Sequence, residues 1–97
     1  MEERKTRAVE VDGIAFELAI DPANDYELAA CSTTAHDPAA TPVERSRAID
    51  RMHRLVLGGE RQRVLDELRR RNGGALPIEA VNSFVNRAIS QAVEAKN

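Results

Sequence analysis

Residues 41–59, TPVERSRAIDRMHRLVLGG, decide the fold class of this chain. Thr41 stands at a helix N-cap, a proline follows it at the first helical position, and Glu44 completes a capping box. Apolar residues then recur at steps of three and four, with arginines largely on the opposite side, as on an amphipathic helix. Gly58-Gly59 is a common helix stop. The stretch therefore predicts a helix over residues 41–57.

Two further helices are predicted downstream by the same periodicity. The first spans residues 60–72, with Val64, Leu65 and Leu68 on its apolar side, and it ends at a Gly-rich turn. The second spans residues 77–95 and carries the longest apolar stripe of the chain. The stripe consists of Ile78, Val81, Phe84, Val85, Ala88, Ile89, Ala92 and Val93. It is either buried in the domain's own core or partly uncovered for a partner, and the sequence leaves both interpretations open.

Upstream, the sequence predicts a β-hairpin. Apolar residues alternate with polar ones on both sides of Asp12-Gly13, a preferred two-residue turn, which predicts a hairpin over residues 7–20. A lone hairpin is only marginally stable in water, so its apolar face must pack against the helices. Residues 1–6 are expected to be a flexible N-terminus.

A shorter helix is predicted between the hairpin and residue 41. It covers residues 24–34, with Asn24 or Asp25 as its N-cap. A loop over residues 35–40 follows, because Pro38 disfavours helix in the residue before it.

These elements predict a mainly α fold, a small helical domain of about four helices with an N-terminal β-hairpin. A chain of 97 residues is too short for a second core, so residues 7–97 form one domain. Its apolar share of 42% and charged share of 31% are typical of a soluble globular protein. The single cysteine excludes an internal disulfide, and no apolar run approaches the roughly 18 residues of a membrane span. We therefore expect a cytoplasmic protein without a membrane partner.

No pattern typical of an enzyme or a cofactor site stands out. Cys31 lies among apolar residues and is expected to be a small buried hydrophobe. His53 is expected at the edge of its helix's apolar face rather than on a metal, whereas His36 is expected in a solvated loop. Neither Gly58-Gly59 nor Gly73-Gly74 has the Lys-terminated pattern of a phosphate-binding loop. We expect no enzymatic activity, no cofactor, and no catalytic or metal-binding residues.

Arginine is the most unevenly distributed residue type. All nine basic residues within residues 41–72 are Arg, which gives this block a net charge of +4, whereas residues 1–40 carry −6. Such a density of arginines can bind nucleic-acid phosphates. Interleaved acidic residues, and the place of Arg69-Arg70-Arg71 at a helix C-terminus, instead explain the block as a solvated or protein-facing surface. Nucleic acid is therefore the less favoured partner.

The layout from the hairpin onward resembles the small tail assembly chaperones of long-tailed bacteriophages. The resemblance covers roughly residues 7–95 and depends on an apolar-Gly corner at 55–62, a short helix at 64–68, a Gly turn at 72–74 and an amphipathic helix from 76. It implies that the chain binds the long, helical tape measure protein and keeps it soluble during tail assembly. It also implies action in the host cytoplasm, absence from the mature virion, and the major tail protein as a second candidate partner.

We therefore predict a tail assembly chaperone, with a small DNA-binding regulator that uses the Arg-rich middle helices as the alternative. The candidate client-binding residues are apolar positions of the last helix together with arginines that supply charge complementarity. They are Ile78, Val81, Val85, Ile89, Arg51, Arg54, Arg69 and Arg70. Self-association into a homo-oligomer is a further expectation.

Overall fold

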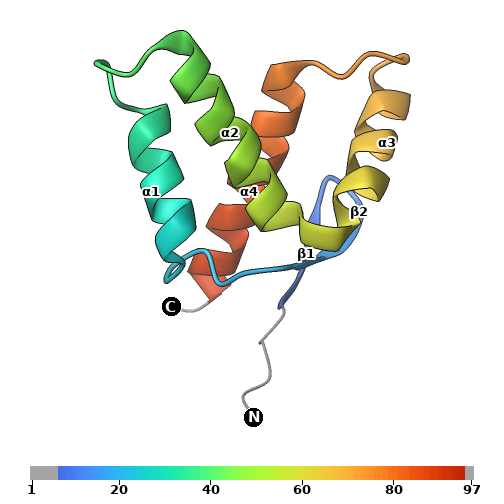
Figure 1. Cartoon of the computed structure of the whole chain (residues 1–97). Helices are drawn as coiled ribbons and strands as arrows, with labels where there is room; N and C mark the ends of the chain where they lie inside the picture. Colours follow the sequence, from blue (N-terminus) through green and yellow to red (C-terminus); the bar gives the residue numbers. More distant parts are fainter. Residues whose placement is uncertain (1–6, 96–97) are drawn as a thin grey trace.

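The computed structural model describes residues 7–95 and shows a mainly helical fold with an N-terminal two-stranded hairpin (Figure 1). The elements are β1 (Arg7–Val11), β2 (Ile14–Leu18), α1 (Tyr26–Ala35), α2 (Pro42–Leu57), the short 3₁₀ helix η1 (Gly58–Glu60), α3 (Arg61–Arg71) and α4 (Ile78–Ala95). The prediction of a mainly α fold with a hairpin at its start is confirmed. The expected flexible segment 1–6 lies outside the described residues.

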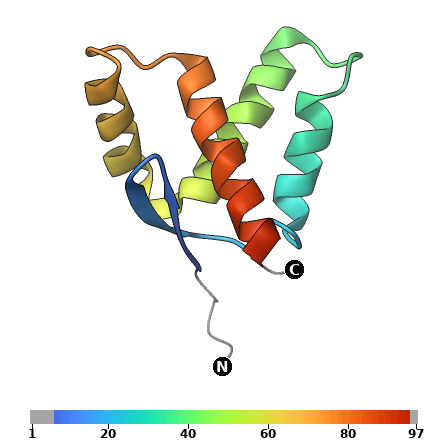
Figure 2. The same cartoon turned by 180° about the vertical axis from the view of Figure 1, so that it is seen from behind.

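The two longest helices, α2 and α4, cross at the centre of the molecule (Figures 1 and 2). Helix α1 lies beside α2, and β1 lies along α4. The hairpin therefore covers one side of α4, while α2 covers another.

The hairpin forms because its turn and its alternating pattern agree. Asp12 and Gly13 adopt positive φ angles of 52° and 81°, as the favoured two-residue hairpin turns require. The inward-facing residues of both strands are buried, namely Val9, Val11, Ile14, Phe16 and Leu18. The strands end at Leu18 rather than at the predicted residue 20, because the backbone N–H of Ala19 turns away and donates to the carbonyl of Val56 on α2 (3.4 Å).

The core lies where this hairpin face meets α4 and the ends of α2 and α3. The rings of Phe16 and Phe84 stack with their centroids 5.6 Å apart, which joins the hairpin to α4 at its middle. Most of the apolar stripe of α4 faces this core and is buried. Its buried members are Val81, Phe84, Val85, Ala88 and Ala92.

Side-chain caps set the starts of α1 and α2. The Asp25 carboxylate accepts the backbone N–H of Leu28 (2.9 Å), so α1 begins at Tyr26, two residues later than the predicted residue 24. The predicted capping box is confirmed: Thr41 Oγ1 accepts the N–H of Glu44 (3.1 Å), and Glu44 Oε1 accepts the N–H of Thr41 (2.8 Å). The other predicted helix limits agree with the observed ones to within one residue.

The corner between α2 and α3 depends on Gly58. This residue has φ 53° and ψ −133°, a conformation that residues with a Cβ rarely adopt. A Cβ placed on Gly58 would lie 2.5 Å from the Cβ of Ala19, where the hairpin exit passes the corner. The corner therefore requires glycine for its backbone conformation and for the close approach of the hairpin.

Candidate binding site

The structure separates the four apolar residues that the sequence predicted for client binding. Val81 (6% exposed) and Val85 (1% exposed) belong to the core, and Ile89 is partly buried against it. Ile78, in the first turn of α4, is 72% exposed. Of the two interpretations that the sequence left open, burial in the domain's own core holds for most of the α4 stripe, because the hairpin and α2 cover it. Val81 and Val85 therefore do not form an exposed client-binding surface as predicted. Ile78 is the most exposed of the four.

A pocket of about 260 Å³ opens beside Ile78, between α2, α3 and the start of α4. Figure 1 shows α2 and α3 separated at this end of the molecule, with the start of α4 between them. The apolar wall consists of Ile49, Leu65, Leu76, Ile78 and Val81. Pockets that hold whole small molecules usually measure roughly 300–1,000 Å³. The pocket is therefore suited to one large apolar side chain of a protein partner.

Polar side chains from α2 and α3 complete the lining of the pocket. They are Ser46, Asp50, His53 and Arg61. Arg54, one turn along α2, donates to the Asp50 carboxylate (Nε to Oδ2, 2.8 Å) and is the main cause of the lowered pKa of Asp50. Arg61 approaches the same carboxylate less closely, with Nη2 3.6 Å from Oδ1. The Nε atom of Arg61 is buried and has no hydrogen-bond partner among residues 7–95.

His53 links α2 to α4 at the inner side of this pocket. Its Nε2–H donates to Oδ1 of Asn82 on α4 (2.6 Å). Burial lowers the pKa of His53 below the usual 6.5, so the ring is neutral near pH 7. The half-buried ring lies at the edge of the apolar face of α2, as predicted. Within the described part of the chain, no group of three or more His, Cys, Asp or Glu side chains is placed to hold a metal ion.

A shallower hollow continues from the pocket along the outer side of α2. It is lined by Pro42, Val43, Ser46, Arg47 and Asp50, and it shares Ser46 and Asp50 with the pocket. Two large apolar side chains are exposed here: Val43 (59% exposed), which lines the hollow, and Ile78, which lines the pocket. We call the pocket and this hollow together the α2 groove.

The four predicted arginines lie outside the lining of the pocket. Each is paired with a carboxylate of the chain: Arg51 with Glu27, Arg54 with Asp50, Arg69 with Asp66, and Arg70 with Glu67. The structure does not bring them together with Ile78. The partners are acidic residues of the chain itself, so the charges of these arginines are largely neutralised within the domain. This favours a solvated surface.

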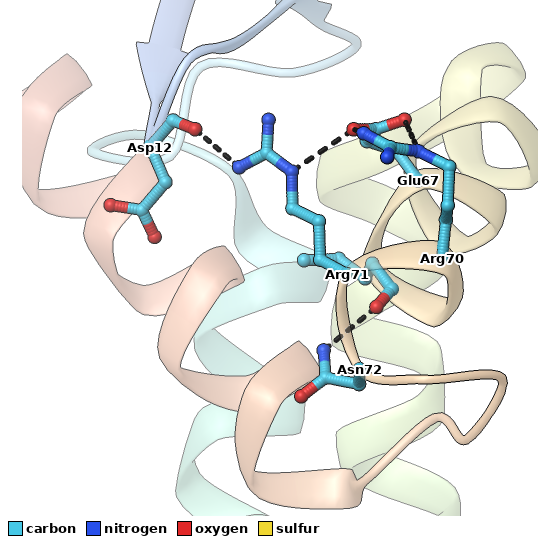
Figure 3. A network of polar contacts seen from close by, with 6 residues as sticks. Asp12, Glu67, Arg70, Arg71 and Asn72 are labelled. Atoms are coloured by element: carbon cyan, nitrogen blue, oxygen red, sulfur yellow. Dashed lines mark hydrogen bonds and ion pairs between the residues drawn. The ribbon is translucent and has the colours of Figure 1, made fainter.

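The arginines at the end of α3 connect this helix to the hairpin (Figure 3). Arg70 and Arg71 both bind the Glu67 carboxylate, and together they lower the pKa of Glu67 to about 2. Arg71 also donates to the backbone carbonyl of Asp12 in the hairpin turn, and the Asn72 amide closes the last turn of α3. This cluster therefore has a structural role in the fold.

Two predictions on α1 and the loop after it have different outcomes. Cys31 is only partly buried, not fully buried as expected, because α1 packs against α2 on one side and leaves Tyr26 exposed. His36 is exposed at the end of α1, as predicted, with Nδ1 2.8 Å from the carbonyl of Ser32.

Local sequence patterns did not identify the pocket. Its lining comes from three elements that are separated along the chain, and Arg61 belongs to an Arg-rich stretch in which nothing distinguishes it. The sequence signal that could have identified Arg61 is its position, two residues after Gly59 and just before the apolar residues of α3.

Comparison of the chain with family models, with curated proteins and with solved structures finds no match. Among the described residues, none of the helices combines the length and the apolar character needed to cross a membrane.

Proposed function

We propose that this chain is a chaperone for a helical client protein, of the kind that keeps a phage tape measure protein soluble during tail assembly. The observation that carries the proposal is the α2 groove, which contains an apolar pocket of side-chain size and has Val43 and Ile78 exposed in its lining. An amphipathic helix binds such a groove by inserting apolar side chains from one face. The resemblance of the layout to tail assembly chaperones supplies the identity of the client.

The small size of the groove agrees with a chaperone that binds in many copies. One side-chain pocket on a domain of 97 residues gives weak binding. A long client that repeats its apolar stripe can hold many such domains, and multivalent contact raises the overall affinity. Such a chaperone would act in the host cytoplasm without a cofactor and would be absent from the mature virion.

Co-expression tests the proposal. The full chain is produced together with the tape measure protein encoded near its gene, and the soluble fraction of that client is measured. We expect a several-fold increase with the wild-type chain and no increase with Ile78→Asp. Ser83→Asp is the matched control, because it places the same charge on an exposed position of α4 outside the groove. A client that is equally insoluble with and without the wild-type chain refutes the proposal.

The alternative, a DNA-binding regulator, draws less support from the structure. Its candidate surface at the end of α3 is occupied by pairs between arginines and carboxylates, which DNA phosphates would have to displace. Duplex binding that persists at physiological salt would favour this alternative. Binding limited to salt below about 50 mM would be ordinary non-specific attraction.

A further inference from the structure

We propose that the pocket recognises a carboxylate beside a large apolar side chain on the client helix, and that Arg61 receives this carboxylate. The inference rests on the proposed function and specifies the chemistry of the client segment. It assigns a role to Arg61, which lines the pocket and whose Nε atom has no hydrogen-bond partner among the described residues.

The Arg61 side chain is incompletely hydrogen-bonded among the described residues. Its Nε–H is buried and has no hydrogen-bond partner within residues 7–95, whereas buried polar groups are nearly always hydrogen-bonded. Its nearest carboxylate oxygen, on Asp50, is 3.6 Å away. The same Asp50 carboxylate binds Arg54 at 2.8 Å. Arg61 and Arg54 therefore share the Asp50 carboxylate, and Arg54 lies closer to it.

The side of the pocket near Asp50 is positively charged. Asp50 lies between two guanidinium groups, those of Arg54 and Arg61, and burial keeps the neighbouring His53 ring neutral near pH 7. One carboxylate facing two guanidinium groups leaves an excess positive charge on this side of the pocket. A client carboxylate would be attracted there, and a guanidinium can bind it through two parallel N–H groups. A client lysine would be repelled.

Apolar and basic groups lie side by side in the pocket. Leu65 lies one turn after Arg61 on α3, so the apolar wall and the guanidinium lie next to each other in the same pocket. On a client helix, residues three or four positions apart lie on the same face. A leucine-like side chain with Asp or Glu one turn away therefore matches the pocket and Arg61 together.

The test uses the full chain and two synthetic amphipathic peptides of about 20 residues, long enough to form helix. In the first peptide, every leucine of the apolar face has Glu one turn away, so that the binding register is irrelevant. In the second peptide, Gln replaces each of these Glu residues. Affinities are measured by titration calorimetry for the wild type, Arg61→Gln and Arg63→Gln. Arg63 is the matched control, because it lies on α3 outside the groove and pairs with Glu60.

We expect the wild type to bind the Glu peptide about tenfold more tightly than the Gln peptide, the effect of one charge-assisted hydrogen bond. Arg61→Gln should reduce this preference to less than about twofold, whereas Arg63→Gln should retain it. Circular dichroism confirms that each variant is folded.

Three results would overturn the inference. Equal affinity of the wild type for both peptides would show that the pocket does not recognise a carboxylate, although the groove would still bind a helix. If Arg61→Gln and Arg63→Gln lose the preference for the Glu peptide equally, that preference is due to non-specific charge attraction. Absence of binding by either peptide removes the pocket as a helix site. In each case the co-expression experiment still decides the proposed function on its own.

Discussion

The change Gly58→Ala tests whether the corner between α2 and α3 depends on glycine. At this corner the backbone has φ 53° and ψ −133°, and an added Cβ would lie 2.5 Å from the Cβ of Ala19. Neither partner can move easily, because the N–H of Ala19 is hydrogen-bonded to the carbonyl of Val56 on the last turn of α2. The change therefore combines backbone strain with steric overlap.

The expected loss of stability is large for a domain of this size. A non-glycine residue held in a sparsely populated backbone region costs about 1–3 kcal/mol. An additional methyl group in a tightly packed site costs about 1–3 kcal/mol. The free energy of unfolding should therefore fall by about 2–6 kcal/mol, against a total of roughly 5–15 kcal/mol for a typical protein.

Gly59→Ala is the matched control for this change. Gly59 has no positive φ, and no atom lies within 4 Å of the position of its added Cβ. Ala at this position should leave the stability unchanged or raise it by about 0.4–1 kcal/mol, because the unfolded chain loses conformational freedom. Urea unfolding followed by far-ultraviolet circular dichroism measures both variants. A difference of less than about 1 kcal/mol between them would refute the description of the corner.

Three further predictions concern the cap, the groove and the response to pH. Thr41→Ala removes one half of the capping box and should lower the free energy of unfolding by about 0.5–2 kcal/mol in urea titration, whereas Thr41→Ser should retain most of it. Ile78→Asp should change that free energy by less than about 0.5 kcal/mol because Ile78 is exposed, whereas Val85→Asp buries a charge and should prevent folding in thermal melts. The pKa of Glu67 is lowered to about 2, so its contribution to stability is complete above pH 4.5 and is lost as the pH falls towards 2; Glu67→Gln should flatten acid unfolding curves over this range. A stability curve for Glu67→Gln that matches the wild type from pH 4.5 to 2 would contradict the pairing with Arg70 and Arg71.

Local signals predicted most of the fold because they act within a few residues. The capping box at Thr41, the turn at Asp12-Gly13 and the apolar periodicity of α2, α3 and α4 each determine their element without reference to the rest of the chain. The hairpin end and the start of α1 were predicted two residues away from their observed positions. The hairpin end is set by the bond from Ala19 to Val56, a tertiary contact that the local pattern does not contain.

The candidate site was predicted only in part, because burial is a property of the assembled chain. The spacing of Val81 and Val85 correctly indicated an apolar face on α4, but the placement of β1 and α2 against α4 determines that this face is covered. Arg61 became a candidate because its Nε atom is buried without a hydrogen-bond partner among residues 7–95, which only the folded chain reveals.

The contacts between β1 and the last turns of α4 join two segments that are synthesised at different times. Arg7 donates to the carbonyl of Ala92 (2.6 Å), and Glu10 exchanges two hydrogen bonds with the Gln91 side chain (2.9 and 2.7 Å). The hairpin is translated before the helices, and its apolar face is not fully covered until α4 is made. At ~5–20 residues per second, the ribosome needs about 4–15 s to proceed from Phe16 to Ala92. During these seconds the apolar side chains of the hairpin segment lack part of their cover, so the nascent chain is prone to association until α4 has been made.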